Sequence, residues 1–230
     1  MRLNLLIGAL ASLSTLGLAP GGVHAADLLS QQCVACHAIA KPDHATLDRL
    51  WERKAPDLYY AGSKFNRPWL VNWLQNPTTL RAGGVMYAKS VKASADKSAD
   101  VIDPALVPAH LKLSAADATT AADLLMTLKG DGLVTPGAYK NEAAGSMAAM
   151  LFSKLRGCTS CHMAKPGGAP TSGPELHTAG ERLQPDFVVA YINNPQKFDD
   201  HTWMPSLGLT DADVQKLTGY ISTLKSTEKK

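Results

Sequence analysis

One five-residue pattern occurs twice in this chain and takes up every cysteine in it. The two copies are Cys33-Val34-Ala35-Cys36-His37 and Cys158-Thr159-Ser160-Cys161-His162. Each copy holds two thiols three positions apart, followed directly by an imidazole. Side chains three positions apart lie on the same face of a helical turn. Any fold of this chain must therefore present two thiols and a histidine together, in two separate places.

The pattern C-x-x-C-H is the attachment signal for c-type haem. Two thiols at this spacing reach the two vinyl groups of one porphyrin, and the adjacent histidine lies beneath the iron as its proximal ligand. C-x-x-C pairs also occur in zinc sites, in structural disulfides and in thioredoxin-like redox pairs. None of these requires a histidine after both pairs. We therefore predict two haem c groups, with iron ligands His37 and His162 and covalent attachment through Cys33, Cys36, Cys158 and Cys161.

The first 25 residues have the pattern of a secretory signal peptide. Arg2 supplies a positive charge, Leu3 to Ala19 form an apolar stretch, and Pro20 breaks it before a small-x-small cleavage site that ends at Ala25. The apolar stretch falls just short of a membrane-spanning helix, so an uncleaved anchor is the alternative. Because haem c is attached after export, this segment agrees with the two motifs. We predict a periplasmic protein, membrane-anchored only if the signal is kept.

The composition is that of a globular protein. Of 230 residues, 45% are hydrophobic and 19% are charged, which excludes a disordered polymer. The formal net charge of +3 offers no basis for binding nucleic acid or anionic lipid. Aromatic residues make up only 6%, so something other than aromatic side chains fills part of the interior. Two porphyrins would do so.

The sequence around the two motifs is repeated as well. Residues 55–86 align without a gap with residues 173–204, and residues 111–129 align with residues 207–225. The first copy is longer at two places, ahead of the first aligned range and between the two ranges. The chain therefore reads as a duplication with insertions in its first copy. Identical pairs include Pro56/Pro174, Gly62/Gly180, Asn76/Asn194, Pro77/Pro195 and Met86/Met204.

Helical patterns dominate both copies. Residues 68–74 and 186–192 predict short amphipathic helices that end at Asn-Pro. The last helix of each copy begins with a capping pattern, which predicts helices after Ser114 and after Thr210. No segment has the pattern of a strong run of strands. The residues thus favour an all-α fold.

The segment before the second motif predicts a further helix. Residues 146–156 place Met147, Met150, Leu151 and Leu155 on one face, as a buried face would require. Most methionines fill gaps in cores. We therefore interpret Met126, Met147 and Met150 as core residues rather than ligands.

Each copy resembles a class I cytochrome c domain, an all-helical fold around one haem. The second copy has the fuller pattern: a helix into C-x-x-C-H, then Gly173-Pro174-Glu175-Leu176, then Trp203-Met204-Pro205, then a terminal helix. The resemblance implies that the carbonyl of Pro56 or Pro174 accepts a hydrogen bond from the proximal histidine, which fixes the ring. We expect an all-α fold of two tandem cytochrome c-like domains, each around one covalently bound haem.

This resemblance divides the chain into four parts. After the signal peptide at residues 1–25, the first cytochrome c domain covers residues 26–130. A linker marked by glycine and proline follows at residues 131–142. The second domain covers residues 143–230.

The resemblance also implies a methionine as sixth iron ligand. Met204 takes this place in the second copy, and Met86 aligns with it in the first. A thioether opposite histidine favours Fe(II), raises the reduction potential and fills the sixth site. Met86 departs from the pattern because Tyr87 rather than proline follows it. Counting back from the last helix instead puts Pro108 opposite Met204, with His110 two residues away, so His110 is the alternative ligand.

The remaining histidines and the insertion receive plainer interpretations. His44, His177 and His201 are not shared between the copies, so we expect surface or edge residues. Residues 87–110 contain balanced lysines and aspartates among alanines and serines, which predicts a solvated loop, with a partner contact as the alternative.

Three functions are compatible with these features. Two six-coordinate irons without a separate catalytic constellation favour a dihaem electron carrier, or the electron-transfer subunit of a redox complex. Its partners would be a redox donor and an acceptor, among them membrane or periplasmic oxidoreductases. A haem enzyme resembling thiosulfate dehydrogenase or a peroxidase, or a haem-based sensor, would need an open iron site, and only the first copy leaves room for one. The number of protein ligands on each iron separates these three functions, since fold alone does not assign function.

Overall fold

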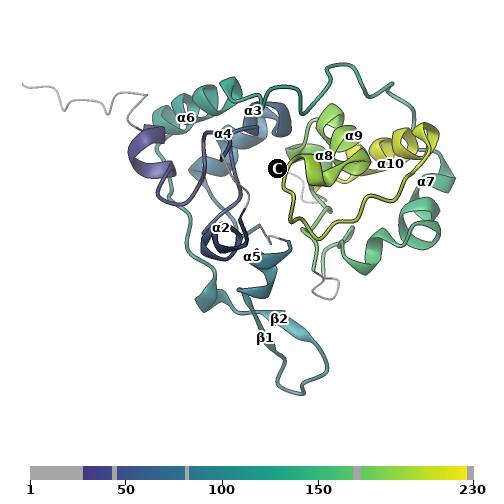
Figure 1. Cartoon of the computed structure of the whole chain (residues 1–230), viewed down its shortest axis with the longest axis horizontal. Helices are drawn as coiled ribbons and strands as arrows, with labels where there is room; N and C mark the ends of the chain where they lie inside the picture. Colours follow the sequence, from purple (N-terminus) through teal and green to yellow (C-terminus); the bar gives the residue numbers. More distant parts are fainter. Residues whose placement is uncertain (1–27, 43–45, 81–82, 168–171, 227–230) are drawn as a thin grey trace, which may run out of the picture.

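The computed structural model describes residues 28–42, 46–80, 83–167 and 172–226. The predicted signal peptide and His44 lie outside these ranges. Within them, no helix has the length and apolar character that crossing a membrane requires. We call the described residues up to 130 the first half and those from 131 onward the second half. Figure 1 shows the two halves side by side, with a small hairpin projecting below.

The first half packs short helices against one long one. Leu28, Leu29, Leu70, Leu74 and Leu125 contribute to its apolar core. Its helices, in chain order, are η1 (Leu29–Cys33), α2 (Leu47–Glu52), α3 (Ala61–Lys64), α4 (Arg67–Gln75), α5 (Val85–Ala88), η2 (Pro104–Leu106) and α6 (Ala115–Thr127).

The second half follows the same order around its own core. Phe152, Phe187, Val188, Leu217 and Ile221 are among the buried residues. Its helices are α7 (Ser146–Met150), η3 (Leu151–Leu155), η4 (Cys158–Ser160), α8 (Ala179–Arg182), α9 (Pro185–Asn193), η5 (Pro195–Lys197) and α10 (Asp211–Thr223). The predicted helices at 68–74, 186–192 and after both caps are confirmed.

The aligned glycines explain how the long helix packs in each half. The amide of Gly62 donates to the carbonyl of Leu128, and the amide of Gly180 donates to that of Leu224, both at 2.8 Å. A Cβ on either glycine would collide with a backbone carbonyl near the end of the long helix. Only glycine permits so close an approach of two backbones. The duplicated sequence therefore produces the same helix contact twice.

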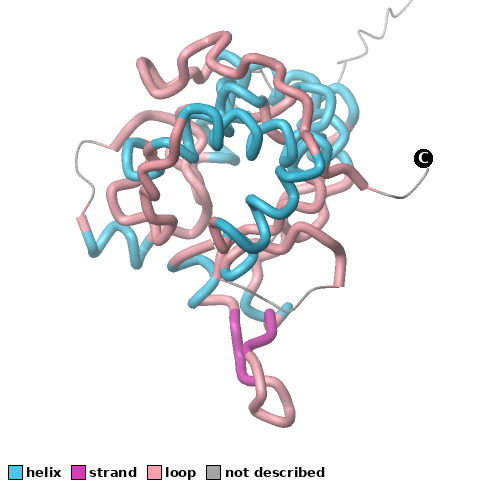
Figure 2. Tube along the Cα trace, turned by 90° about the vertical axis from the view of Figure 1, so that its right-hand side faces the viewer, coloured by secondary structure: helices cyan, strands magenta, loops and turns pink. Residues whose placement is uncertain are grey.

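The insertion in the first half is ordered, which corrects the prediction of a loop. β1 (Val91–Ala93) pairs antiparallel with β2 (Asp100–Ile102), with Val91 opposite Ile102. The amide of Asp103 donates to the carbonyl of Ser90 at 2.8 Å and closes the base of the hairpin. Figure 2 shows the two strands projecting from the body of the molecule. β1 and β2 have only three residues each, so alternation of polar and apolar residues could not predict them from the sequence.

The face predicted for residues 146–156 is wrong. Ala148, Leu151 and Phe152 are buried there, whereas Met147 is 55% exposed and Leu155 is 58% exposed. Within η3, a π-helical turn, the helix departs from the 3.6-residue period, so Leu155 no longer shares the face of Leu151. Met147 and Met150 precede this turn, and both are surface residues rather than core residues.

The two halves meet through an interface with two-fold character. Phe65 and Leu183, which are aligned residues, form an antiparallel bridge. The amide of Asn66 donates to the carbonyl of Arg182, and the amide of Gln184 donates to that of Lys64. Because Asn66 and Gln184 are also aligned, each half offers the other the same groups, as in an isologous dimer contact.

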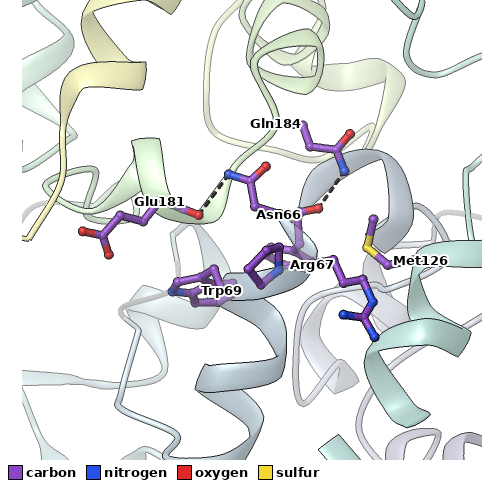
Figure 3. A pocket seen from close by; sticks show the side chains of 8 residues that line it. Asn66, Arg67, Trp69, Met126, Glu181 and Gln184 are labelled. Carbon is purple, nitrogen blue, oxygen red and sulfur yellow. Dashed lines mark hydrogen bonds between the residues drawn. The ribbon is translucent and has the colours of Figure 1, made fainter. Parts of the chain in front are cut away.

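The side chains of Asn66 and Gln184 repeat this two-fold relation. Asn66 Nδ2 donates to the carbonyls of Glu181 and Leu183, at 2.9 and 3.2 Å. Gln184 Nε2 donates to those of Gly62 and Phe65, at 3.0 and 2.6 Å. Figure 3 shows the bond from Asn66 to Glu181 and the Gln184 side chain reaching toward the first half. Every one of these bonds crosses between the halves.

Apolar packing and one cation complete the contact. Tyr59 and Tyr60 of the first half belong to the core cluster of the second. Lys64 Nζ lies 5.0 to 5.6 Å from the ring centres of Tyr60, Phe65 and Phe187. Burial lowers the pKa of Lys64 to about 8. The interface is therefore fixed by packing as well as by hydrogen bonds.

Candidate functional site

The first motif forms a single tight turn. η1 ends at Cys33, whose carbonyl accepts hydrogen bonds from the amides of Cys36 and His37, at 3.1 and 2.9 Å. This turn brings both thiols and the imidazole to neighbouring places on one short segment. The geometry is that predicted from the spacing.

The second motif forms the same turn. The carbonyl of Cys158 accepts from the amides of Cys161 and His162, at 3.2 and 2.9 Å. A 3₁₀ helix, η4, spans the residues between the thiols. Gly157 precedes it with a φ of 63°, a left-handed conformation that glycine adopts without strain. The two motifs therefore share their backbone geometry although different helices lead into them.

Each histidine ring is held by the predicted proline carbonyl. His37 Nδ1 lies 2.6 Å from the oxygen of Pro56, and His162 Nδ1 lies 2.8 Å from that of Pro174. A carbonyl can only accept, so Nδ1 carries the proton in both rings. In a neutral imidazole this makes Nε2 the metal-binding nitrogen. Pro56 and Pro174 thus set the tautomer that an iron ligand needs.

Burial favours the neutral form of the first ring. It lowers the pKa of His37, and the nearby His110 also lowers it, although the bond to Pro56 acts in the other direction. Burial also raises the pKa of the Cys33 and Cys158 thiols. At neutral pH the histidine therefore keeps a lone pair, while these two cysteines are held as thiols, the form that adds to a vinyl group.

The donor set fits haem c better than the other chemistries of C-x-x-C pairs. All four cysteines are described, and no disulfide joins any of them. Among the described residues, no three His, Cys, Asp or Glu side chains gather as a metal-ion site. The four thiols therefore do not converge on one zinc ion. Each motif instead stands alone with its own histidine.

Apolar side chains at the surface also fit a large apolar cofactor. Leu106 and Leu111 lie close in sequence to His110, and they are 50% and 49% exposed. Trp203 and Leu207 flank Met204, with exposures of 51% and 48%. Exposed apolar groups gathered in this way mark binding sites. They stand on the segments that carry the candidate sixth ligands in both halves.

Met204 lies in irregular chain between η5 and α10. The side chain of Gln196 donates to the Met204 carbonyl at 2.8 Å. Tyr191 of α9 reaches the same segment, its hydroxyl 3.2 Å from Thr202 Oγ1. Met204 as sixth ligand stays a prediction, now with two side chains that hold its loop.

Met86 lies on α5, close to the second half. The amide of Gly84 donates to the carbonyl of Ser172 at 3.0 Å, and a Cβ on Gly84 would lie 3.8 Å from the ring of Trp203. Gly83 faces Pro174 more closely still, because a Cβ on Gly83 would lie 2.7 Å from Pro174 Cδ. The ligand role of Met86 also stays a prediction, but the two residues before α5 contact the second half.

His110, the alternative ligand, lies near His37. Their ring centroids are 6.2 Å apart, with ring planes inclined at 55°. Trp73 of α4 contacts the His110 ring edge-on, at a centroid distance of 4.5 Å. Sequence reasoning did not find Trp73, although its alignment with Tyr191 is the signal that could have done so. The structure thus joins the first motif to a residue beyond the hairpin.

Sequence reasoning also missed a charged network beside the first motif. The carboxylate of Asp57, which is 7% exposed, accepts from Arg49 Nη2 at 2.6 Å and pairs with Arg53 Nη1 at 3.5 Å. Arg53 in turn reaches Asp199 of the second half at 2.8 Å. Asp57 directly follows Pro56, so this network holds the segment that orients His37. The two arginines belong to the stretch between the motif and the proline, which is longer in the first copy than in the second.

His177 and His201 are both half-buried. The buried Nδ1 of His177 has no hydrogen-bond partner, and the amide of His201 donates to Asp199 Oδ1 at 3.0 Å. Their half-buried positions agree with the expectation of surface or edge residues.

The geometry of the second half defines a covalent haem-binding segment, and comparison with known proteins agrees. The family model described as Cytochrome c matches residues 147–225. This part of the chain is therefore a cytochrome c domain, a kind of domain that binds haem c covalently and serves in electron transfer. Neither a curated protein nor a solved structure matches the chain.

Proposed function

We propose that the protein is a periplasmic dihaem cytochrome c that carries single electrons between redox partners, as a shuttle or as the electron-transfer subunit of a redox complex. The observation that carries the proposal is the repeated proximal geometry: two C-x-x-C-H turns, each with its histidine bonded to an aligned proline carbonyl at 2.6 or 2.8 Å. Haem c supplies one-electron iron chemistry when bound. The chain's own residues attach it, orient its ligands and exclude water.

The contact between the halves supports this role. Bonds from Asn66 and Gln184 and the bridge of Phe65 with Leu183 hold both motifs in one body. Fixed spacing between two redox centres permits internal electron transfer without domain motion. The predicted signal peptide, together with attachment of haem c after export, supports the periplasmic location.

An enzyme acting at the first haem is less well supported. Such an enzyme needs an open or labile iron position. His110, with its ring centre 6.2 Å from that of His37, is a candidate to fill that position. The geometry therefore favours a carrier.

Haem content tests the proposal directly. The purified protein should contain two haems per chain, because each motif presents both thiols and an oriented histidine. The double variant Cys33→Ala/Cys36→Ala should lose one haem and keep the other, and Cys158→Ala/Cys161→Ala is the matched control for the second motif. Absorbance of the reduced pyridine complex against protein mass measures this content. One haem per wild-type chain would contradict the dihaem proposal.

A further inference from the structure

The ring contact between His37 and His110 has a spacing that calls for an explanation. Packed imidazoles can lie at many distances, and these two have centroids 6.2 Å apart. They come from segments far apart in the chain, one before the core helices and one after the hairpin. Resting on the proposed haem at the first motif, we propose that His110 is the sixth ligand of its iron, so that this haem is held by two histidines.

The distance agrees with two axial bonds. Metal–imidazole bonds are about 2 Å long. With each nitrogen about 1.2 Å from its ring centre, imidazoles on opposite sides of one metal ion have centroids about 6.4 Å apart. The observed 6.2 Å matches this value. The 55° between the ring planes is allowed, because axial rings can rotate about their bonds to the metal.

Both rings carry the proton on the correct nitrogen. His110 Nδ1 lies 2.9 Å from the carbonyl oxygen of Leu111, and His37 Nδ1 lies 2.6 Å from that of Pro56. A carbonyl accepts, so Nδ1 donates in each case and Nε2 holds the lone pair. A metal-binding histidine is typically oriented by such a bond from its other nitrogen. His110 therefore has the tautomer and the supporting bond of a ligand.

The fold gives His110 the place that Met204 has in the second half. Trp73 contacts the His110 ring, and the aligned Tyr191 bonds to Thr202, two residues before Met204. His110 precedes the capping residue Ser114 by four positions, and Met204 precedes Thr210 by six. In both halves the ligand segment thus leads into the cap of the last helix.

A backbone bond holds the His110 segment against the first core. The amide of Leu113 donates to the carbonyl of Leu74, at the end of α4, with a length of 3.0 Å. Leu113 and Trp73 both pack against the apolar cluster of the first half. The aromatic contact holds the ring, and this bond fixes the chain just after it. The ring is thereby positioned before any ligand bond forms.

Met86 is held elsewhere. The chain just before it bonds to Ser172 and faces Pro174 and Trp203, all in the second half. At the end of α5, Lys89 Nζ donates to the carbonyl of Trp51. The hairpin after α5 is closed at its base by the bond between Asp103 and Ser90, and the chain beyond it leads to His110. The ring contact of His110 with His37 therefore favours His110 over Met86 as the sixth ligand.

Spectra of single variants test the assignment in the holoprotein. The wild type should show two different low-spin ferric signals by electron paramagnetic resonance, one from a histidine pair and one from histidine with methionine. His110→Ala should keep two haems but make one of them high-spin when ferric and able to bind carbon monoxide when reduced. Met86→Leu, which removes the thioether at nearly constant volume, should leave both signals unchanged and carbon monoxide unbound.

A second substitution guards against a loss of folding. His110→Met keeps a ligand at this position, so it should convert the histidine-pair signal to the histidine–methionine type and raise the potential of that haem. If Met86→Leu opens one haem and His110→Ala changes nothing, the proposal is overturned. Two haems that both show thioether ligation would also overturn it while leaving the dihaem function intact. A single haem, at the second motif, would overturn both.

Discussion

The two halves of the molecule share the proximal side of their candidate haem sites and differ on the opposite side. Both present a C-x-x-C-H turn whose histidine donates to a proline carbonyl. Further along the chain, the second half carries the predicted ligand Met204 in irregular chain before α10, whereas the first half inserts a hairpin and returns with His110 near His37. The comparison teaches that a repeated scaffold can keep one proximal geometry while the segment before its last helix changes, so two haems bound as we propose could be tuned separately.

The halves also differ in the charges behind the proximal segment. Asp57 of the first half pairs with Arg49 and Arg53 and is almost fully buried. The aligned Glu175 is half-buried, and its backbone carbonyl, not its carboxylate, accepts the bond from Arg182 at 2.6 Å. The same position therefore serves as an ionic anchor in one half and as a backbone contact in the other.

The largest effect on stability should come from this ionic anchor. Asp57→Ala leaves the Arg49 guanidinium without a carboxylate and leaves Arg53 with Asp199 alone. Loss of one partner from a buried pair costs about 3 kcal/mol. Glu175→Ala, the matched control, should cost about 1 kcal/mol or less, as for an exposed pair. Urea denaturation followed by circular dichroism measures both. Equal losses of unfolding free energy in the two variants would contradict the ionic anchor of the first half.

A smaller and symmetric effect is expected at the interface. Asn66→Ala and Gln184→Ala each remove two hydrogen bonds to backbone carbonyls of the other half. Each should lower the free energy of unfolding by about 1–2 kcal/mol, and by similar amounts because the residues are aligned. Asn72→Ala, on the exposed side of α4, should change it by less than about 0.5 kcal/mol. A loss confined to one of the two would break the two-fold relation.

The sequence predicts the motif turns, the proline contacts and the last helices because each depends on local chemistry or on direct alignment. The caps at Ser114 and Thr210 form as the pattern requires, each accepting from the amide three residues later. The contacts of Pro56 and Pro174 were implied by the resemblance to cytochrome c domains, and the alignment of the two copies paired the two prolines. Where the chain repeats itself, pattern and structure agree.

The features that the sequence could not predict depend on contacts distant in the chain or on altered helical period. The π-helical turn η3 changes which residues of 146–156 are buried, and periodicity analysis assumes one period throughout. The pairing of His37 with His110 requires the hairpin to return the chain to the first core. The ungapped alignment of the two copies stops at Met86. It therefore favours Met86, before the insertion, over His110, after it, as the sixth ligand.

A redox titration of the wild type and of His110→Met tests the central claim most directly. The account predicts two separate one-electron steps in the wild type, because methionine raises the potential of one iron and the histidine pair does not. In His110→Met the lower step should move upward toward the upper one, while the upper step stays in place. A lower step that does not move, or an upper step that does, would contradict the assignment of His110 to the first iron.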